Sequence, residues 1–267
     1  MRRLIACCLV GLLSIAPLQA ARDFDGVDDV ISCGSAAAID NFATFTVSAW
    51  FYSDSAASNA YGVTKSDGTN GWHIEYDSRV GVTRIRFYTN WSTTDGGWST
   101  PVDSIAINAW YHIAVTYDNS LTTNDPVIYI NGASQSLTET STPAGTAASE
   151  AAVNFTIGDR DAGPGSFFNG RIAEASYYNV ILNADAIQGI RRCPLFYPNG
   201  LKLYVPLYGI SSPELDLTGN GNVGTVTGAV RIDHPPGISA VPFRVIAWLM
   251  EPLLSPLARY LDLRLFA

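Results

Sequence analysis

Short segments that alternate apolar with polar residues follow one another along this chain, and clusters of turn-forming residues separate them. Most of these segments are rich in β-branched and aromatic residues, which is the pattern of a half-buried β-strand. Strands at such regular spacing predict an all-β fold, an antiparallel sandwich of two sheets. The expected strands cover residues 45–52, 60–65, 72–76, 83–88, 110–118, 126–130, 133–137, 155–158 and 170–178.

Turn and cap residues predict how some of these strands are joined. Asn131-Gly132 is the strongest hairpin signal in the chain, and Gly26 predicts a tight bend or bulge near the start. Asn183 is a suitable N-cap for one short helix over residues 184–192. The segment 90–101 holds two tryptophans and a Gly-Gly pair, and we expect it to be a loop.

The first residues have the layout of a targeting signal. Arg2 and Arg3 precede an apolar run, and Pro17-Leu18-Gln19-Ala20 stand before a small residue, Ala21. This arrangement predicts a secretory signal peptide over residues 1–20, removed on export. The protein is then expected to be secreted, extracellular or on the cell surface, with the periplasm as an alternative.

The remaining chain divides into a sandwich at residues 21–232 and a tail at 233–267. Within the sandwich we expect a core at 22–192 and a C-terminal strand extension at 200–232. The tail is apolar, and prolines divide it into short helical pieces. An apolar segment of this size is expected to be covered. It can pack on the sandwich, dock on a partner subunit or lie on a membrane surface, and the remaining alternative is a disordered or processed tail.

The charge balance narrows the class of partner. The chain has a formal net charge of -8 at pH 7 and a sequence pI of about 4.7. Proteins that bind nucleic acid carry a basic patch, so we expect no nucleic-acid partner. After loss of the signal peptide, Cys33 and Cys193 remain. In an oxidising compartment they can form a disulfide, and the alternative is two buried free thiols.

Four carboxylates surround Gly26 near the expected start of the mature protein: Asp23, Asp25, Asp28 and Asp29. Such density is costly unless the carboxylates meet water, hydrogen-bond donors or a cation. A hard, oxygen-ligated cation such as calcium is one answer, which makes these four residues candidate ligands. A solvated acidic turn is the alternative.

Two glycine-containing segments offer candidate ligand-binding side chains. Aromatic rings that stack on sugars and polar groups that bind hydroxyls are what a small polar ligand needs. The candidates are Trp91, Asp95, Trp98, Asp159 and Asp161. The alternative is that the two tryptophans cover the edge of the sandwich.

One pair of carboxylates has the spacing of a glycosidase. Glu75 and Asp77 stand at alternate positions of an expected strand and so face the same side. Arg79 occupies the next alternate position, where a third acid would be needed. We therefore expect a solvated strand end with a Glu–Arg contact, and a chain that is not an enzyme.

Several stretches, in order, resemble the laminin G-like branch of the concanavalin A-like lectin superfamily as found in bacteria and phages. The resemblance covers Arg22 to Arg192. It implies a jelly-roll sandwich and says little about the ligand. The stretches are Phe24-Asp25-Gly26-Val27-Asp28-Asp29, Phe45 to Phe51, Trp110 to Asp118, Ile128 to Gly132, Ile157-Gly158, Phe168 to Ile172 and Tyr177 to Ala186.

Many domains of this family bind calcium near the opening motif, so the resemblance makes Asp25 the first candidate ligand. One departure weakens that expectation: relatives commonly read Ile-Asp-Glu in the last strand, and this chain reads Ile172-Ala173-Glu174. The function expected is a secreted, noncatalytic module that binds a glycan or surface polymer with calcium support. The alternative is a structural protein of a filament, cell surface or virion that assembles through its tail.

Overall fold

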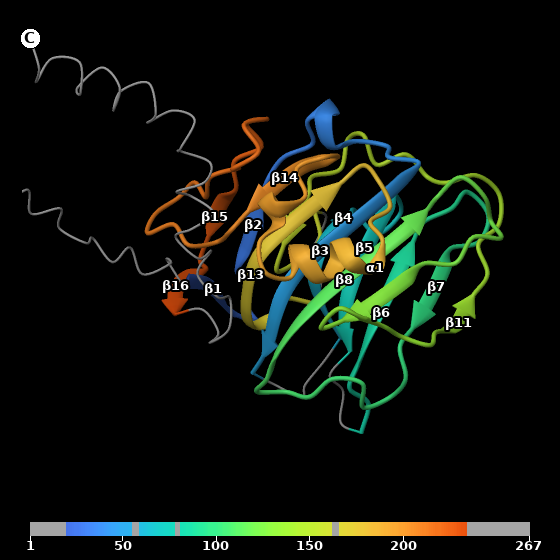
Figure 1. Ribbon diagram of the computed structural model, residues 1–267, viewed down its shortest axis with the longest axis horizontal. Helices are drawn as coiled ribbons and strands as arrows, with labels where there is room; N and C mark the ends of the chain where they lie inside the picture. The colour runs from blue at the N-terminus through green and yellow to red at the C-terminus, as the bar shows by residue number, and fades with distance from the viewer. Residues whose placement is uncertain (1–19, 55–58, 78–80, 162–165, 234–267) are drawn as a thin grey trace, which may run out of the picture. The chain divides into compact units, whose positions relative to one another are not determined.

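A computed structural model describes residues 20–54, 59–77, 81–161 and 166–233 (Figure 1). These residues form two antiparallel sheets, named sheet A and sheet B, which pack face to face. Sheet A contains β1 (Ala20–Asp25), β3 (Thr44–Ser53), β8 (Trp110–Asp118), β9 (Val127–Ile130), β10 (Ala133–Ser134), β13 (Asn169–Tyr178), β14 (Leu201–Val205) and β16 (Val230–Asp233). Sheet B contains β2 (Val30–Ser32), β4 (Asn59–Ser66), β5 (Gly71–Asp77), β6 (Arg84–Thr89), β7 (Gly96–Ser99), β11 (Thr138–Ser141), β12 (Thr156–Ile157) and β15 (Thr225–Thr227). The predicted all-β sandwich is therefore confirmed.

The alternation of residue types decides which face of each strand is buried. In β3, Val47, Ala49 and Phe51 are buried in the core between the sheets, whereas Trp50 is half-buried on the outer face. Strand β8 pairs with β3 so that His112 lies opposite Trp50. Residues directly opposite each other share a face, so His112 also belongs to the outer face of sheet A. Successive side chains of a strand point to opposite faces, so a sequence period of two sends one set of side chains into the core and the other set to the outer face of the sheet.

Aromatic rings fill the centre of the sandwich. The ring of Phe45 lies 5.2 Å from Trp72 and 5.8 Å from Tyr177, measured between centroids. The first of these partners belongs to sheet B and the second to sheet A, so Phe45 joins the two layers. Edge-to-face and offset contacts of this kind add to the gain from burying apolar area.

The single α-helix among the described residues, α1 (Ala184–Ile190), covers the outer face of sheet A (Figure 1). Ile187 and Ile190 pack there against Ala114 of β8 and Tyr178 of β13. The Asn183 side chain accepts a hydrogen bond from the Ala186 N–H at 2.9 Å, which confirms the predicted N-cap. Two short 3₁₀ helices, η1 (Ala37–Ile39) and η2 (Pro194–Phe196), complete the described helical structure.

Strands from the C-terminal stretch belong to both sheets. Strand β14 pairs with β13, β15 with β2, and β16 with β1. A buried ion pair joins this stretch to the first strand, because Arg22 Nε donates to Glu214 Oε1 at 2.7 Å. The Arg22 guanidinium also donates to the backbone carbonyls of Gly209, Ser211 and Ala229.

Segment 90–101 departs from the prediction, because residues Gly96–Ser99 form strand β7 and are not a loop. The Gly-Gly pair that indicated a loop serves close packing instead. A Cβ at Gly97 would lie 2.9 Å from the Tyr88 ring, and one at Gly96 would lie 2.5 Å from the Trp98 ring. Glycine inside a strand marks such close approach.

Cys33 and Cys193 are both free thiols in the structure, so of the two alternatives the disulfide is not formed. Cys33 is buried in the core between the sheets, at the end of β2. Cys193 follows α1 on the outer side of sheet A. The sheet lies between them, and a disulfide needs Cα atoms within about 7 Å.

The predicted signal peptide and the apolar tail lie outside the described residues, apart from Ala20 and Asp233 at the ends of β1 and β16. Within the described part of the chain, no helix has the length and apolar character needed to cross a membrane.

Candidate functional site

The two tryptophans predicted to stack on a ligand are buried. Trp98 is 1% exposed, its indole lies 5.5 Å from the Tyr117 ring, and its Nε1 donates to Asp125 at 2.8 Å. Trp91 is 7% exposed and lies in a β-bridge with Ala147. The prediction that these rings face a ligand is wrong, because the sandwich packing covers both.

Two of the three aspartates predicted with them hold loops in place. Asp95 accepts hydrogen bonds from the Trp91 N–H at 2.9 Å and from Asn90 Nδ2 at 3.1 Å. Asp161 accepts from the Asn154 N–H and Nδ2. Asp159 is buried, with 3% of its surface exposed. These five residues are not brought together into one site.

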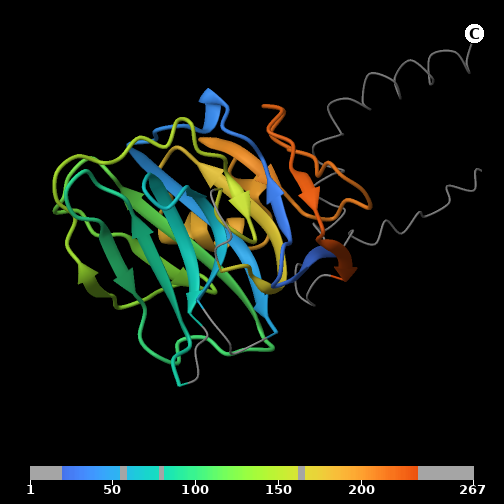
Figure 2. The ribbon, with the colours of Figure 1, turned by 180° about the vertical axis from the view of Figure 1, so that it is seen from behind.

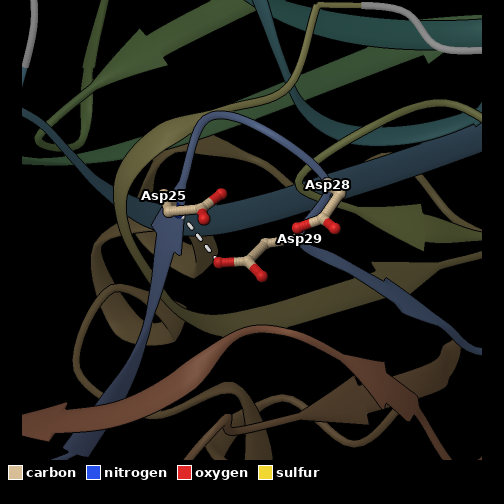
Figure 3. Close-up of side chains that lie close together, drawn as sticks. All are labelled: Asp25, Asp28 and Asp29. Atoms are coloured by element: carbon tan, nitrogen blue, oxygen red, sulfur yellow. Dashed lines mark hydrogen bonds between the residues drawn. The ribbon is translucent and has the colours of Figure 1, made fainter.

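Three of the four acidic residues predicted as metal ligands do come together. One carboxylate oxygen each from Asp25, Asp28 and Asp29 lies within 4.8 Å of the others, at the turn between β1 and β2 (Figure 3). Gly26, at φ +77, makes the predicted tight bend between them. The Asp25 N–H donates to Asp29 Oδ2 at 2.8 Å, and the Val27 N–H donates to Asp25 Oδ1 at 2.8 Å.

Asp29 is the buried member of this acidic triad, with 6% exposure, whereas Asp25 and Asp28 are exposed. Burial raises the pKa of Asp29, and the neighbouring carboxylates of Asp25 and Asp28 raise it further, against the hydrogen bond from Asp25 N–H. A Cβ at Gly228 would lie 1.7 Å from Asp29 Oδ1, so only glycine leaves that oxygen room. Clustered carboxylates of this kind suit a hard cation that also keeps water ligands.

Asp23 does not join the triad. It lies opposite Arg171 in the β1–β13 pairing, and its Oδ1 is 3.4 Å from Arg171 Nε. Burial raises the pKa of Asp23, and the Arg171 charge opposes that rise. Asp23 is therefore an ion-pair partner on the outer face of sheet A.

A pocket lies on the outer face of sheet B, and Figure 2 views the molecule from that side. The loop patterns in the sequence did not predict it. It has a volume of about 310 Å³. Its walls come from alternate, outward-facing positions of β4, β5 and β6, together with loop residues. We call it the sheet B pocket, and its lining is Asn59, Tyr61, Gly68, His73, Glu75, Arg86, Tyr88, Asn90, Asp95 and Arg160.

Two tyrosine rings flank His73 in this pocket. The imidazole stacks on Tyr88 at 5.0 Å and meets Tyr61 edge-on at 4.9 Å, between ring centroids. Burial lowers the pKa of His73 to about 3, and the charges of Arg160 and Arg86 act in the same direction. The imidazole is therefore neutral at physiological pH and adds an aromatic surface without adding charge.

Arginines lie over both tyrosine rings. The Arg86 guanidinium carbon is 4.7 Å from the Tyr88 centroid, and that of Arg160 is 5.4 Å from the Tyr61 centroid. These distances are within the range of cation–π contacts. The pocket thus combines aromatic faces with charged hydrogen-bond donors in a half-buried setting.

The paired carboxylates of β5 each contact an arginine of β6. Glu75 Oε1 lies 3.4 Å from Arg86 Nη1, and Asp77 Oδ2 lies 3.2 Å from Arg84 Nε. Only Glu75 lines the sheet B pocket. This arrangement differs from two carboxylates that act on one bond, where one carries a proton and the other stays free to attack.

Strand alternation, and not loop composition, is the sequence pattern that could have indicated residues of the sheet B pocket. His73 and Glu75 alternate with buried Trp72, Ile74 and Tyr76, so their outward position follows from the period of two. What the period does not give is the order of the strands. The pairing of β5 with β6 places Tyr88 opposite His73.

The family profile for laminin G domains, described as the concanavalin A-like lectin/glucanases superfamily, matches residues 25–188. A search of curated proteins gives no significant match.

Solved structures share the fold at low sequence identity. A Bacteroides ovatus structure assigned as a carbohydrate binding protein is 20% identical, with a TM-score of 0.57 over 81% of this chain and 60% of that one. The heptameric SAP-like pentraxin of Limulus polyphemus is 13% identical, with a TM-score of 0.56 over 81% of this chain and 96% of that one. The CBM40 of Ruminococcus gnavus IT-sialidase, bound to α2,3 sialyllactose, is 11% identical, with a TM-score of 0.51 over 65% of this chain and 98% of that one. At these identities the likeness concerns the fold alone.

Proposed function

The chain belongs to the concanavalin A-like lectin/glucanases superfamily, and we propose that it is a secreted, noncatalytic module whose sheet B pocket binds carbohydrate. The observation that carries the proposal is the convergence of Tyr61, His73 and Tyr88 with two arginines in one half-buried pocket. Aromatic surface with a few placed polar groups is the usual composition of a small-ligand site. The carbohydrate-binding names of two similar structures support the same proposal.

The noncatalytic part of the proposal rests on Glu75 and Asp77. Each carboxylate lies within ion-pair distance of an arginine on the neighbouring strand, and only Glu75 lines the sheet B pocket. A glycosidase needs two carboxyl groups that flank the same glycosidic bond. Secretion follows from the predicted signal peptide at residues 1–20 and remains part of the proposal.

Replacing Tyr88 with alanine is expected to weaken glycan binding about tenfold or more, because truncating a central aromatic contact commonly costs more than 1–2 kcal/mol. The measurement is retention on a printed glycan array, followed by calorimetric titration of the oligosaccharide retained most strongly. Tyr52→Ala is the matched control. Tyr52 also faces outward with a guanidinium over its ring, at 4.6 Å from Arg171, but it lies on sheet A.

Two outcomes would contradict this function. An array without any retained glycan is one, and equal losses of affinity in Tyr88→Ala and Tyr52→Ala are the other. Tyr88→Phe keeps the ring and is expected to keep most of the affinity. A loss in that variant equal to the alanine loss would assign the contact to the hydroxyl and not to ring stacking.

We further propose that the acidic triad of Asp25, Asp28 and Asp29 binds calcium, and that the bound calcium stabilises the folded sandwich. The donor set fits a hard cation, since it supplies several carboxylate oxygens at one turn. Calcium at about 100 times its dissociation constant is expected to add about 2.7 kcal/mol of stability, which raises the melting temperature by several degrees.

The measurement is thermal unfolding with excess calcium and with chelator. Asp28→Asn replaces an exposed carboxylate that makes no hydrogen bond among the described residues. The variant should abolish the rise in melting temperature with calcium and leave the melting temperature of the calcium-free protein unchanged. Asp118→Asn, at a turn outside the triad, is the control and should keep the shift. Equal melting temperatures with calcium and with chelator would remove the metal from the proposal.

The alternative function, an assembly protein of a filament, cell surface or virion, depends on the tail at residues 233–267 as the docking element. That tail lies outside the described residues except for Asp233. The alternative therefore stays a prediction, and the oligomeric state of the full chain measured by light scattering tests it.

A further inference from the structure

The charges that line the sheet B pocket are not all paired within the protein. Glu75 contacts Arg86, and Asp95 accepts hydrogen bonds from the Asn90 side chain and the Trp91 backbone. Arg160 differs, because it forms no ion pair with a carboxylate of any described residue. Its Nη1 donates to the Tyr61 hydroxyl at 3.3 Å. Arg160 is therefore the cation of this lining that has no ion-pair partner among the described residues.

Two residues lie close to the Arg160 guanidinium. It lies over the Tyr61 ring, and the backbone at Gly68 also comes close to it. A Cβ at Gly68 would lie 2.9 Å from Arg160 Nη1 and 3.4 Å from its Cζ, so the absence of a side chain there makes room for the guanidinium. A guanidinium fixed in this way has lost part of its freedom before a ligand arrives, which lowers the cost of binding.

A guanidinium presents parallel N–H donors that match the two oxygens of a carboxylate. His73, which lies between the two tyrosines, is uncharged near pH 7, so Arg160 supplies the charge that is free to act. The tyrosine rings, the imidazole and the Arg160 guanidinium line the same 310 Å³ pocket. A sugar unit that carries a carboxylate has a group suited to each of them.

We infer that the sheet B pocket selects acidic sugars of the uronic acid class, and that Arg160 binds the carboxylate. This inference rests on the proposed carbohydrate binding and names its ligand class. The net charge of -8 bears on this inference, because the protein as a whole repels polyanions. Binding of an acidic glycan then requires a local cation and is not a general electrostatic attraction.

The test uses trisaccharides of galacturonic, glucuronic and mannuronic acid, each beside its methyl ester, in calorimetric titrations with chelator present. Esterification removes the charge and keeps the sugar ring. At least one acid is expected to bind tenfold or more tightly than its ester. Arg160→Gln is expected to remove that difference, whereas Arg160→Lys keeps part of it. Arg192→Gln, at an exposed arginine on the sheet A side, is the matched control and should change nothing.

Each other outcome overturns a distinct statement. Equal affinity for acids and esters, with binding that still depends on Tyr88, overturns the acidic class and leaves carbohydrate binding intact. A preference for a sulfated galactose trisaccharide over every uronic acid overturns the statement that the bound anionic group is a carboxylate. Acid-selective binding that survives Arg160→Gln overturns the role of Arg160. Absence of binding by all probes and by the glycan array overturns both the inference and the proposed function.

Discussion

Replacing Trp98 with alanine is expected to lower the free energy of unfolding by about 3–5 kcal/mol, the usual cost of truncating a buried aromatic side chain. Trp98 is 1% exposed and packs against Phe87 and Tyr117, with ring centroids 6.2 and 5.5 Å away. Its truncation also removes the hydrogen bond from Nε1 to Asp125. For a domain of this size the melting temperature should fall by roughly 10 °C.

Thermal and urea unfolding measure this effect, and glycan titration accompanies them. Trp110→Ala is the matched control, because Trp110 is half-buried on the outer face of sheet A and should cost less. Trp98→Phe should retain glycan binding in the folded protein. If Trp98→Ala abolished glycan binding at an unchanged melting temperature, the interpretation of Trp98 as a ligand-stacking residue would be right after all.

Replacing Arg22 with methionine is expected to lower the free energy of unfolding by about 3–5 kcal/mol, because it leaves the charge of Glu214 buried without its partner. Arg22 is 4% exposed and Glu214 is 1% exposed. The variant also removes donors to the carbonyls of Gly209, Ser211 and Ala229, and unsatisfied buried acceptors carry their own penalty. The loss should appear as a single lower transition, since the pair joins the first strand to the C-terminal stretch.

The double variant Arg22→Met/Glu214→Leu separates the charge from the packing. It should recover much of the stability, because replacing both members of a buried ion pair by apolar residues is often close to neutral. Arg231→Met is the control: Arg231 is exposed and makes one hydrogen bond, from Nε to the Tyr208 carbonyl. A loss below about 1 kcal/mol in Arg22→Met would place the ion pair in solvent and contradict the structure.

The two candidate sites differ in how far the sequence predicts them. The acidic triad comes from residues 25–29, which one glycine bend brings together. Local sequence was therefore enough to find all three of its members. The sheet B pocket takes residues from positions 59 to 160. Such a site depends on strand order and on a loop far along the chain, and no local pattern contains that information.

Segment 90–101 shows why local rules fail at particular residues. Asp95-Gly96-Gly97 has the composition of a turn, and the backbone nevertheless joins a sheet there. The rings of Tyr88 and Trp98 occupy the space that side chains at these glycines would need. A rule for isolated sequence reads the glycines as chain breakers, whereas the packed sheet uses them as space.

The period of two in the sequence by itself determined the all-β class, most strands and which side chains of a strand share a face, because successive side chains point to opposite sides of a sheet. Local chemistry also determined the Asn183 cap and the Gly26 bend. Only the tertiary structure decided which polar and aromatic side chains share a pocket, which tryptophans are covered, and that Cys33 and Cys193 stay apart. The physical reason is that strand order and burial are set by contacts between residues far apart in the chain, and these form only when the two sheets close on a common core.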